Sequence, residues 1–313
     1  MMTRKKYVSE AIKIISKKIK PAKKVKQIKK ISDLVNDVNA IGIKSGDVIL
    51  VHSSLSSIGS VEEGAYTVID ALLEVIGPMG TLVVPTYPLK GTMLNICLRK
   101  DYIFDIKERP TNWGAIPFFF FNYEDVFRSV HPTHSISAKG KYAKMITESH
   151  HIGDKTYGEN SPWAKIVELN GKVLGIGISL APNTIYHHVE DIMGEKFPVN
   201  VKVNEFYNLK CKTDEDNYIE VKVQPLDPVV AKTRINKNPF IEKYFMSIYE
   251  GLGLLKVRKI GEALSWCVEA KMFCDVLIQL AELGITIYST KKDLKKKKAY
   301  PFNRIKGKIK LNL

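Results

Sequence analysis

Four serines lie in a short stretch between an apolar strand and an expected helix, where they could bind an anion. The stretch reads His52, Ser53, Ser54, Leu55, Ser56, Ser57, Ile58 and Gly59, and is called the serine turn below. Ligands of open α/β sheets lie beyond the carboxyl ends of strands, and helix N-termini attract anions. Backbone N–H groups and hydroxyls of residues 54–57 could therefore hold a pyrophosphate or a pantetheine amide. The P-loop and G-x-G-x-x-G patterns are absent, and a turn that only caps its helix is the alternative.

A second stretch, residues 128–135, concentrates hydrogen-bond donors. It contains Arg128, His131, His134 and Ser135. A guanidinium group can bind a phosphate through two parallel hydrogen bonds, so Arg128 is a candidate ligand for an anion. The two histidines stand three residues apart on an expected loop, a spacing that also permits metal ligation.

A third stretch carries a candidate general base. Residues three apart share one face of a helix, so His187 would lie beside Glu190 and His188 beside Asp191. A carboxylate next to an imidazole fixes its tautomer and raises its basicity, which suits proton abstraction. A surface ion pair and an H-x-x-E metal site would give the same pattern, so three interpretations stay open.

Hydrophobic periodicity predicts the elements that position these residues. The apolar runs 48–51 and 81–85 predict buried strands, and helical spacing of apolar residues from Ala65 to Ile76 predicts a helix between them. Ser60 and Glu63 have the spacing of a capping box at the start of that helix. The unit is βαβ, so we expect the two strands to be parallel.

The pattern of expected strands and helices along the rest of the chain predicts an α/β fold, with a layered mixed sheet flanked by helices. Ser161-Pro162 has the cap-plus-proline form of a helix start. Further helices are expected at 7–38, with a break at Pro21, and at 117–121, 141–149, 161–169, from 183 onward, 239–250 and 270–283. Further strands are expected at 135–138, 172–178 and 285–288, and a β-hairpin at 199–223.

The positive charge of the chain is concentrated at its ends. The formal net charge is +15, yet residues 31–290 hold 26 basic and 31 acidic side chains. We therefore expect a basic helical extension over 1–39, a functional domain over 40–290 and a basic tail over 291–313. Basic ends are commonly solvated. They could also bind an anionic membrane or nucleic acid.

Composition narrows the class of protein. A chain of 313 residues with 45% hydrophobic residues can bury a large core. No apolar run reaches the length of a membrane-spanning helix, and none follows the lysine-rich N-terminus, which argues against a secretory signal. The four cysteines form no C-x-x-C pair. We expect neither a disulfide framework nor a cysteine zinc site, and a cytoplasmic protein.

The ordered set of motifs resembles the aminoglycoside 3-N-acetyltransferase family, also called the antibiotic N-acetyltransferase family. The matching residues are Gly46-Asp47, the serine turn, 61–73, 77–82, Arg128-Ser129, His131-Pro132, Ser135, Gly158, Ser161-Pro162, 171–174, Gly175, Gly177, Thr184, His187 and Glu190. Weaker similarity extends from about residue 40 to 290 and leaves out both basic ends. Glu63 departs from the pattern, because many members of the family have glycine there.

The resemblance implies an acyltransferase with a fold distinct from the GNAT acetyltransferases. Acetyl-CoA would be the donor and an amino sugar the acceptor, and no metal would be needed. The serine turn would hold the pantetheine or pyrophosphate of CoA, with Arg128, His131 and Ser135 in the same cleft. His187, supported by Glu190, would be the base, and Ser135 or N–H groups of the serine turn would stabilise the oxyanion. No cysteine lies in a matched motif, so we expect direct transfer in a ternary complex.

The acceptor is left open by the resemblance, since a fold hosts many specificities and family membership does not guarantee antibiotic resistance. An amino-sugar nucleotide used for surface polysaccharide is an alternative, and the basic ends would then hold the enzyme on an anionic membrane. Vesicle binding that survives removal of residues 1–30 and 291–313 would exclude that role. Other classes considered are a metal-dependent hydrolase using His131, His134, His187 and Glu190, and a polyanion-binding protein without specific nucleic-acid recognition. The oligomeric state is not predicted.

Overall fold

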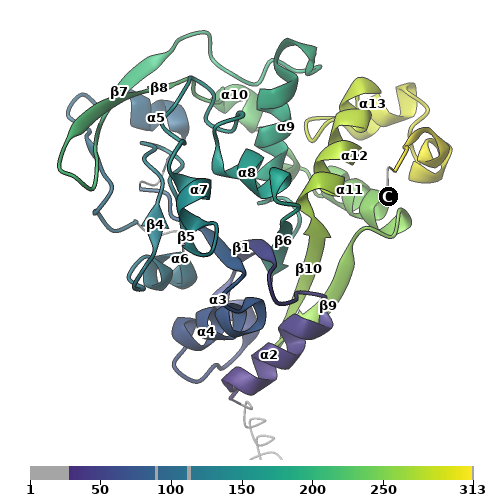
Figure 1. Cartoon of the computed structure of the whole chain (residues 1–313). Coiled ribbons are helices and arrows are strands. Elements are labelled where there is room, and N and C mark those ends of the chain that lie inside the picture. Colours follow the sequence, from purple (N-terminus) through teal and green to yellow (C-terminus); the bar gives the residue numbers. More distant parts are fainter. Residues whose placement is uncertain (1–27, 89–90, 111–113, 312–313) are drawn as a thin grey trace, which may run out of the picture.

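The computed structural model describes residues 28–88, 91–110 and 114–311 (Figure 1). The expected helix over 7–38 lies mostly outside these residues, and its described part is α2. The α-helices are α2 (Ile31–Ala40), α3 (Leu55–Ile58), α4 (Ala65–Ile76), α5 (Met93–Cys97), α6 (Ala115–Phe120), α7 (Ala143–Thr147), α8 (Pro162–Glu168), α9 (Ile185–Met193), α10 (Pro228–Ala231), α11 (Pro239–Gly251), α12 (Ala270–Glu282) and α13 (Lys291–Lys296). The 3₁₀ helices are η1 (Gly194–Lys196), η2 (Ile235–Lys237), η3 (Phe302–Arg304) and η4 (Lys306–Lys308).

The strands form one large mixed sheet and one small sheet. They are β1 (Val48–Ser53), β2 (Thr81–Pro85), β3 (Phe104–Asp105), β4 (Phe127–Arg128), β5 (Ile136–Gly140), β6 (Lys172–Ile176), β7 (Tyr207–Lys212), β8 (Tyr218–Val223), β9 (Lys256–Ile260) and β10 (Ala263–Glu269). Among the described residues the large sheet has the order β4-β5-β2-β1-β6-β10-β9, and the small one β3-β7-β8. β1 runs parallel to β2 and β6, whereas β5 and β10 are antiparallel to their neighbours. The expected βαβ unit is therefore confirmed.

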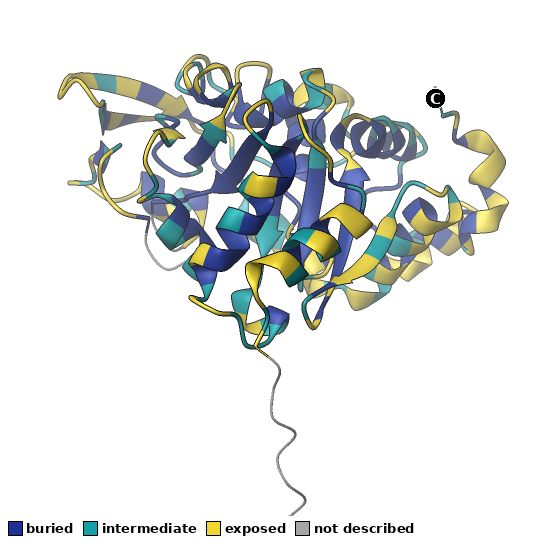
Figure 2. Cartoon of the chain, turned by 60° about the horizontal axis from the view of Figure 1, so that its bottom comes forward, coloured by how far each residue is buried: buried dark blue, intermediate teal, exposed yellow. Residues whose placement is uncertain are grey.

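Both faces of the large sheet are covered, which explains why its central strands are apolar at consecutive positions. Val48 and Leu50 point into a core shared with α7, α8, α9, α11 and α12. Ile49 and Val51 point to the opposite side, where α2, α4 and α6 pack. The strands are correspondingly dark blue between the helical layers in Figure 2. This arrangement confirms the layered α/β class.

Two expectations about local structure are wrong. The Ser60–Glu63 capping box does not form, because Glu63 and Gly64 both have positive φ and α4 begins only at Ala65. The carbonyl of Ser60 instead accepts the N–H of Lys29 at 2.8 Å.

The expected strand at 285–288 is a turn. Its backbone N–H groups bond to nearby hydroxyls rather than to a strand: Thr286 donates to Ser289 Oγ at 2.9 Å. The β9–β10 hairpin was not predicted, because its outer strand exposes Lys256, Arg258 and Lys259. Charged side chains are usual on an edge strand, and they hide the apolar alternation.

The C-terminal segment is part of the body rather than a tail outside it. Leu294, Phe302, Ile305 and Ile309 are buried in the same core as α11 and α12, and Figure 1 shows the segment in yellow beside these helices. Its lysines lie on the solvent face. Removing the segment would therefore cost core packing, and a vesicle-binding test needs charge-reversing substitutions such as Lys295→Glu instead. None of the helices in the described ranges combines the length and the apolar character required to cross a membrane.

Candidate active site

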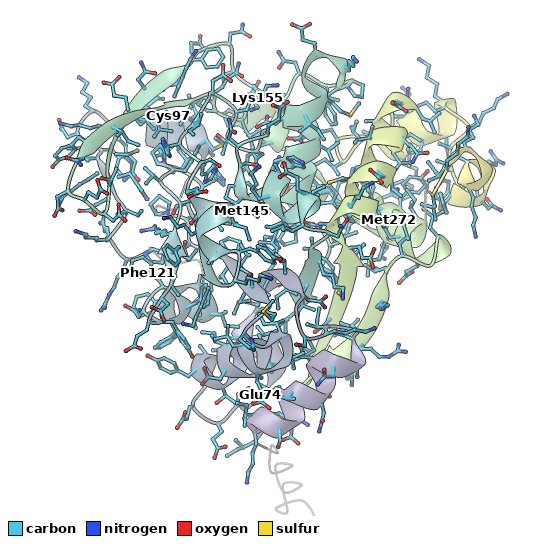
Figure 3. All side chains as sticks on the ribbon, viewed as in Figure 1. Glu74, Cys97, Phe121, Met145, Lys155 and Met272 are labelled. Carbon is cyan, nitrogen blue, oxygen red and sulfur yellow. The ribbon has the colours of Figure 1, made fainter. Side chains whose placement is uncertain are left out.

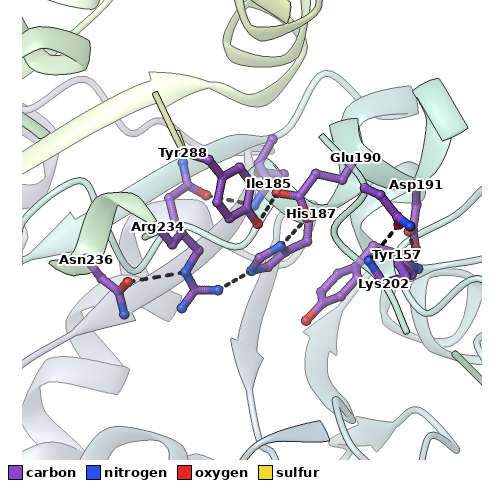
Figure 4. Close-up of polar contacts among 11 residues, drawn as sticks. Tyr157, Ile185, His187, Glu190, Asp191, Lys202, Arg234, Asn236 and Tyr288 are labelled. Carbon is purple, nitrogen blue, oxygen red and sulfur yellow. Dashed lines mark hydrogen bonds and ion pairs between the residues drawn. The ribbon is translucent and has the colours of Figure 1, made fainter. Parts of the chain in front are cut away.

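His187 and Glu190 come together on one buried face of α9, as the sequence predicted (Figure 4). His187 Nδ1 lies 2.6 Å from Glu190 Oε2. The second carboxylate oxygen of Glu190 accepts a hydrogen bond of 2.9 Å from the hydroxyl of Tyr288. Glu190 is thus held from two sides, and it holds the imidazole in a fixed orientation. Of the three interpretations of this motif, an exposed surface ion pair is excluded by the burial of both side chains.

The partners of His187 also determine which ring nitrogen carries the proton. Nη1 of Arg234 lies 2.6 Å from His187 Nε2. A guanidinium can only donate, so Nε2 must be the acceptor, and Nδ1 must then donate to Glu190. His187 is therefore a neutral imidazole whose lone pair is on the nitrogen directed away from the carboxylate.

A pocket of about 370 Å³ opens at His187. Its wall includes Tyr87 just after β2 and Thr184 after β6. It therefore lies at the carboxyl ends of the parallel strands, where α/β folds place their ligands. The other described lining residues are Gly91, Thr92, Met93, His134, Tyr157, Ala181, Pro182, Asn183, Tyr186, Leu226, Pro228, Ala231, Arg234 and Asn236.

Tyr157 forms the wall next to the imidazole, and its backbone is held by α9. The expected His188–Asp191 pair does not form. His188 Nδ1 instead donates to the Tyr157 carbonyl at 2.6 Å, and Asp191 accepts the Tyr157 N–H at 2.8 Å while pairing with Lys202. The Tyr157 ring centroid consequently lies 5.1 Å from that of His187. One face of α9 thus carries His187, and His188 and Asp191 hold the backbone of the neighbouring Tyr157.

The serine turn lies next to this pocket and is joined to it through His52. His52 Nε2 is 3.3 Å from Thr184 Oγ1, which also accepts the indole N–H of Trp163. Burial lowers the pKa of His52 to about 4, so its ring is uncharged near neutral pH. The turn itself is closed by a bond of 3.0 Å from the Ser57 hydroxyl to Ser54 Oγ.

Gly177 allows the serine turn to approach the end of β6. Its φ is +63°, and a Cβ at this position would overlap the Cβ of Ser57. Both the left-handed backbone and the close approach of a neighbouring segment favour glycine here.

Arg128 and Ser135 are placed close together but away from the pocket wall. The guanidinium donates from Nε to Ser135 Oγ at 2.8 Å and from Nη2 to the Thr86 carbonyl at 2.9 Å. Its Cζ lies 5.0 Å from the ring centroid of Phe104 and 5.0 Å from that of Phe121 (Phe121 is labelled in Figure 3). Burial lowers the pKa of Arg128 to about 10. Ser135 is fully buried and donates to the Ser129 carbonyl. Both side chains have structural partners where phosphate binding and oxyanion stabilisation were expected.

His131, His134 and His150 form a cluster rather than a ligand set. His131 Nδ1 accepts the N–H of His134 at 3.1 Å, and its ring stacks on His150 at a centroid distance of 4.4 Å. His134 lines the pocket, whereas His131 does not. In the described part of the chain, no three His, Cys, Asp or Glu side chains gather as ligands for a metal ion. The four residues considered for a hydrolase therefore form no such group.

Three residues of the site were missed in the sequence. Arg234, Tyr288 and Tyr157 belong to no motif, and each reaches the site from an element remote in sequence from α9. Arg234 stands alone in the stretch 232–238, and its sequence context gave no signal that it would contact His187.

Known proteins are similar to this chain over most of its described length. The sequence profile of the aminoglycoside 3-N-acetyltransferase family matches residues 50–282. Aminoglycoside N(3)-acetyltransferase III of Serratia marcescens is 34% identical over 173 residues, which cover 52% of this chain and 64% of the relative. Aminoglycoside N(3)-acetyltransferase IX of Micromonospora chalcea is 31% identical over 181 residues, 53% of this chain and 64% of the relative. The chain thus spans less than two thirds of the length of these curated relatives.

Solved structures share the fold. Aminoglycoside acetyltransferase AAC(3)-Xa superposes with a TM-score of 0.71 and 24% identity, covering 82% of this chain and 94% of its own. AAC-IIIb in a binary complex with CoASH gives a TM-score of 0.67 at 24% identity, with 84% of this chain and 100% of its own covered. Because the profile match spans most of the chain, including His187 and the serine turn, the protein belongs to the aminoglycoside 3-N-acetyltransferase family.

Proposed function

We propose that the protein transfers an acetyl group from acetyl-CoA to a primary amine of an aminoglycoside or another amino sugar. The observation that carries this proposal is the neutral His187, oriented by Glu190 at the wall of a pocket, in a chain of this family. Acetyl-CoA supplies the acetyl group as a thioester. The acceptor supplies an amine, which is an ammonium ion at neutral pH and must lose a proton before it can attack.

His187 is the group that takes this proton. Its Nε2 carries the lone pair and belongs to the pocket wall, and proton transfer leaves an imidazolium whose Nδ1–H stays bonded to Glu190. The adjacent carboxylate stabilises that positive charge, and Tyr288 keeps the carboxylate in place. Glu190 and Tyr288 are thus positioning residues, and His187 alone exchanges the proton.

Direct transfer without an acyl-enzyme is consistent with the placement of the cysteines. Cys97, Cys211, Cys267 and Cys274 are all free and buried, and none lines the pocket. Burial raises the pKa of Cys97, Cys211 and Cys267 to about 12. A thiol that is protonated and buried is a poor nucleophile, so the amine itself attacks the thioester in a ternary complex.

The serine turn is the segment we assign to CoA. The N–H groups of Leu55 and Ser56 have no hydrogen-bond acceptor among the described residues, and Ser56 is exposed. These donors suit a pantetheine amide or the oxyanion that develops during transfer. Arg128, His131 and Ser135 are left out of this assignment, because each is buried and committed to protein partners.

A Gly177→Ala substitution is expected to weaken CoA binding severalfold, because the new methyl group displaces the serine turn. Calorimetric titration with CoA measures this effect. Gly46→Ala is the matched control, since Gly46 also has a positive φ, of +87°, but no atom lies within 4 Å of its added Cβ. Both variants should lose about 1–2 kcal/mol of stability to the left-handed backbone. CoA binding by Gly177→Ala equal to that of Gly46→Ala would remove the serine turn from the CoA site.

The proposed function is tested by mixing the purified protein with acetyl-CoA and amino sugars and following free thiol release. The panel contains 2-deoxystreptamine aminoglycosides and amino-sugar nucleotides. We expect thiol release that depends on the acceptor. Absence of release with every acceptor, together with absence of CoA binding, would refute acetyl transfer.

A further inference from the structure

The pocket at His187 has an unusual charge for a site that would accept a polycation. Of the described residues that line it, Arg234 is the one with a permanent charge, and no Asp or Glu is among them. Glu190 lies on the far side of His187, where its two oxygens are already bonded to His187 and Tyr288. An aminoglycoside with several ammonium groups would therefore meet a cation and no carboxylate on this wall.

Arg234 itself has no anionic partner among the described residues. Its Nη1 donates to His187 Nε2 at 2.6 Å, and its Nε donates to the side-chain oxygen of Asn236 at 3.4 Å. A guanidinium has five N–H donors, so three of them lack an acceptor in the described part of the chain. The side chain is half-buried and lines the pocket. Figure 4 shows its contacts with His187 and Asn236. A partly desolvated cation with unused donors is a binding site for an anion.

The contact between Arg234 and His187 also affects the proton acceptor. Nη1 covers the lone pair of Nε2, the atom that must accept the proton from the amine. The base is therefore blocked until the guanidinium moves away from the ring. A phosphate or carboxylate bound side-on would attract the guanidinium more strongly than a neutral imidazole does, because both partners are then charged.

We propose that the acceptor is an amino sugar that carries an anionic group, a phosphate or a carboxylate, and that Arg234 binds this group. Binding draws the guanidinium from His187 Nε2 and exposes the lone pair to the acceptor's amine. The inference rests on the proposed acetyl transfer and adds the substrate class to it. Hydroxyl and amide groups on the same wall, from Thr92, Asn183 and Asn236, provide neutral partners for sugar hydroxyls.

The test compares acceptors that differ in charge. Glucosamine 6-phosphate and 2-amino-2-deoxyglucuronate are the phosphate and carboxylate arms, methyl glucosaminide is the neutral amino sugar, and kanamycin is the polycation. Binding of each is measured by calorimetry without CoA, and kcat and KM are measured by thiol release. Hydrogen bonds to a charged group are worth about 1.5–3 kcal/mol. We therefore expect at least one anionic arm to exceed methyl glucosaminide roughly tenfold to a hundredfold in affinity and in kcat/KM.

Substitution of Arg234 separates charge recognition from general damage. In Arg234→Ala the ratio of anionic to neutral acceptor should fall to about one, mainly through a higher KM for the anionic sugar. Arg234→Lys should recover part of the ratio, because it keeps the charge but not the planar fork. Arg258→Ala, at an exposed position on β9, should keep the ratio of the wild type.

The two readouts distinguish the inference from the function on which it rests. Arg234-dependent binding of an anionic sugar, without thiol release from any acceptor and without CoA binding, would support Arg234 as an anion-binding residue and refute acetyl transfer. Tighter binding or faster turnover with kanamycin than with either anionic arm would overturn the inference while leaving acetyl transfer intact. So would an anionic-to-neutral ratio unchanged in Arg234→Ala.

Discussion

Turnover of a His187→Ala variant should fall by roughly a hundredfold or more, while acetyl-CoA binding stays near that of the wild type. His187 is the neutral imidazole of the pocket, and its partners leave Nε2 as its accepting nitrogen. Without it the acceptor ammonium must give its proton to water, so the chemical step slows. Thiol release with the best acceptor measures kcat, and calorimetry measures the affinity for acetyl-CoA.

A second histidine provides the control for this result. His151 is outside the pocket wall, so His151→Ala should keep wild-type turnover. His187→Ala turnover within a fewfold of that control would remove His187 from the mechanism. A parallel loss of acetyl-CoA binding would mean that the substitution damages the donor site rather than proton transfer.

The elements that could be predicted from sequence are those whose signals are local. β1 and β2 read as continuous apolar runs because both faces of the sheet are covered. The α8 start was visible because Ser161 Oγ accepts the N–H of Ala164 and Pro162 needs no donor of its own. Such signals depend on a few neighbouring residues and are the same in any tertiary arrangement.

Local signals failed where distant contacts or backbone geometry decide the structure. Glu63 was paired with Ser60 by spacing alone, but its φ is +49°. That left-handed conformation accounts for the glycine which many members of the family have there. Buried Ile285 and Ile287 suggested a strand, yet the segment bonds to its own hydroxyls and brings Tyr288 onto Glu190.

The candidate site was predicted in part for a similar reason. Helical spacing places His187 beside Glu190 wherever the helix packs, so that pair could be found. Residue types do not show which way donors point, and Arg128 is directed at backbone carbonyls and Ser135 rather than at a ligand. Arg234 contacts His187 from 47 positions away in the sequence, which no spacing rule describes.

Stability is expected to fall steeply as the pH is lowered from about 6.5 towards 4. Burial lowers the pKa of His52 to about 4 and that of His150 to about 3. It also holds the pKa values of His131 and His134 well below the usual range, with help from neighbouring histidines and from Lys202. These side chains are neutral in the folded protein and take up protons when it unfolds, because an exposed histidine has a pKa near 6.5.

The sign follows from proton binding. Below about pH 6.5 the unfolded chain binds more protons than the folded one, so the free energy of unfolding decreases with falling pH. For each histidine the loss is roughly 1.4 kcal/mol per pH unit until its folded pKa is reached. Four such groups acting together would exhaust a typical stability of about 5–15 kcal/mol within a few pH units. Above pH 6.5 the four histidines do not change the free energy of unfolding with pH.

Urea unfolding at several values between pH 7.5 and 4.5 measures the linkage. The exposed Asp216, whose pKa is lowered by its hydrogen bond from Lys212, acts only below about pH 4. A loss between pH 6.5 and 5 therefore belongs to the histidines. His150→Gln should reduce the number of protons taken up on unfolding by about one, and with it the dependence of the free energy of unfolding on pH. His52→Gln provides an independent second case. A urea midpoint that stays constant from pH 7.5 to 5 would show that the cluster is protonated, and therefore solvated, in the folded protein.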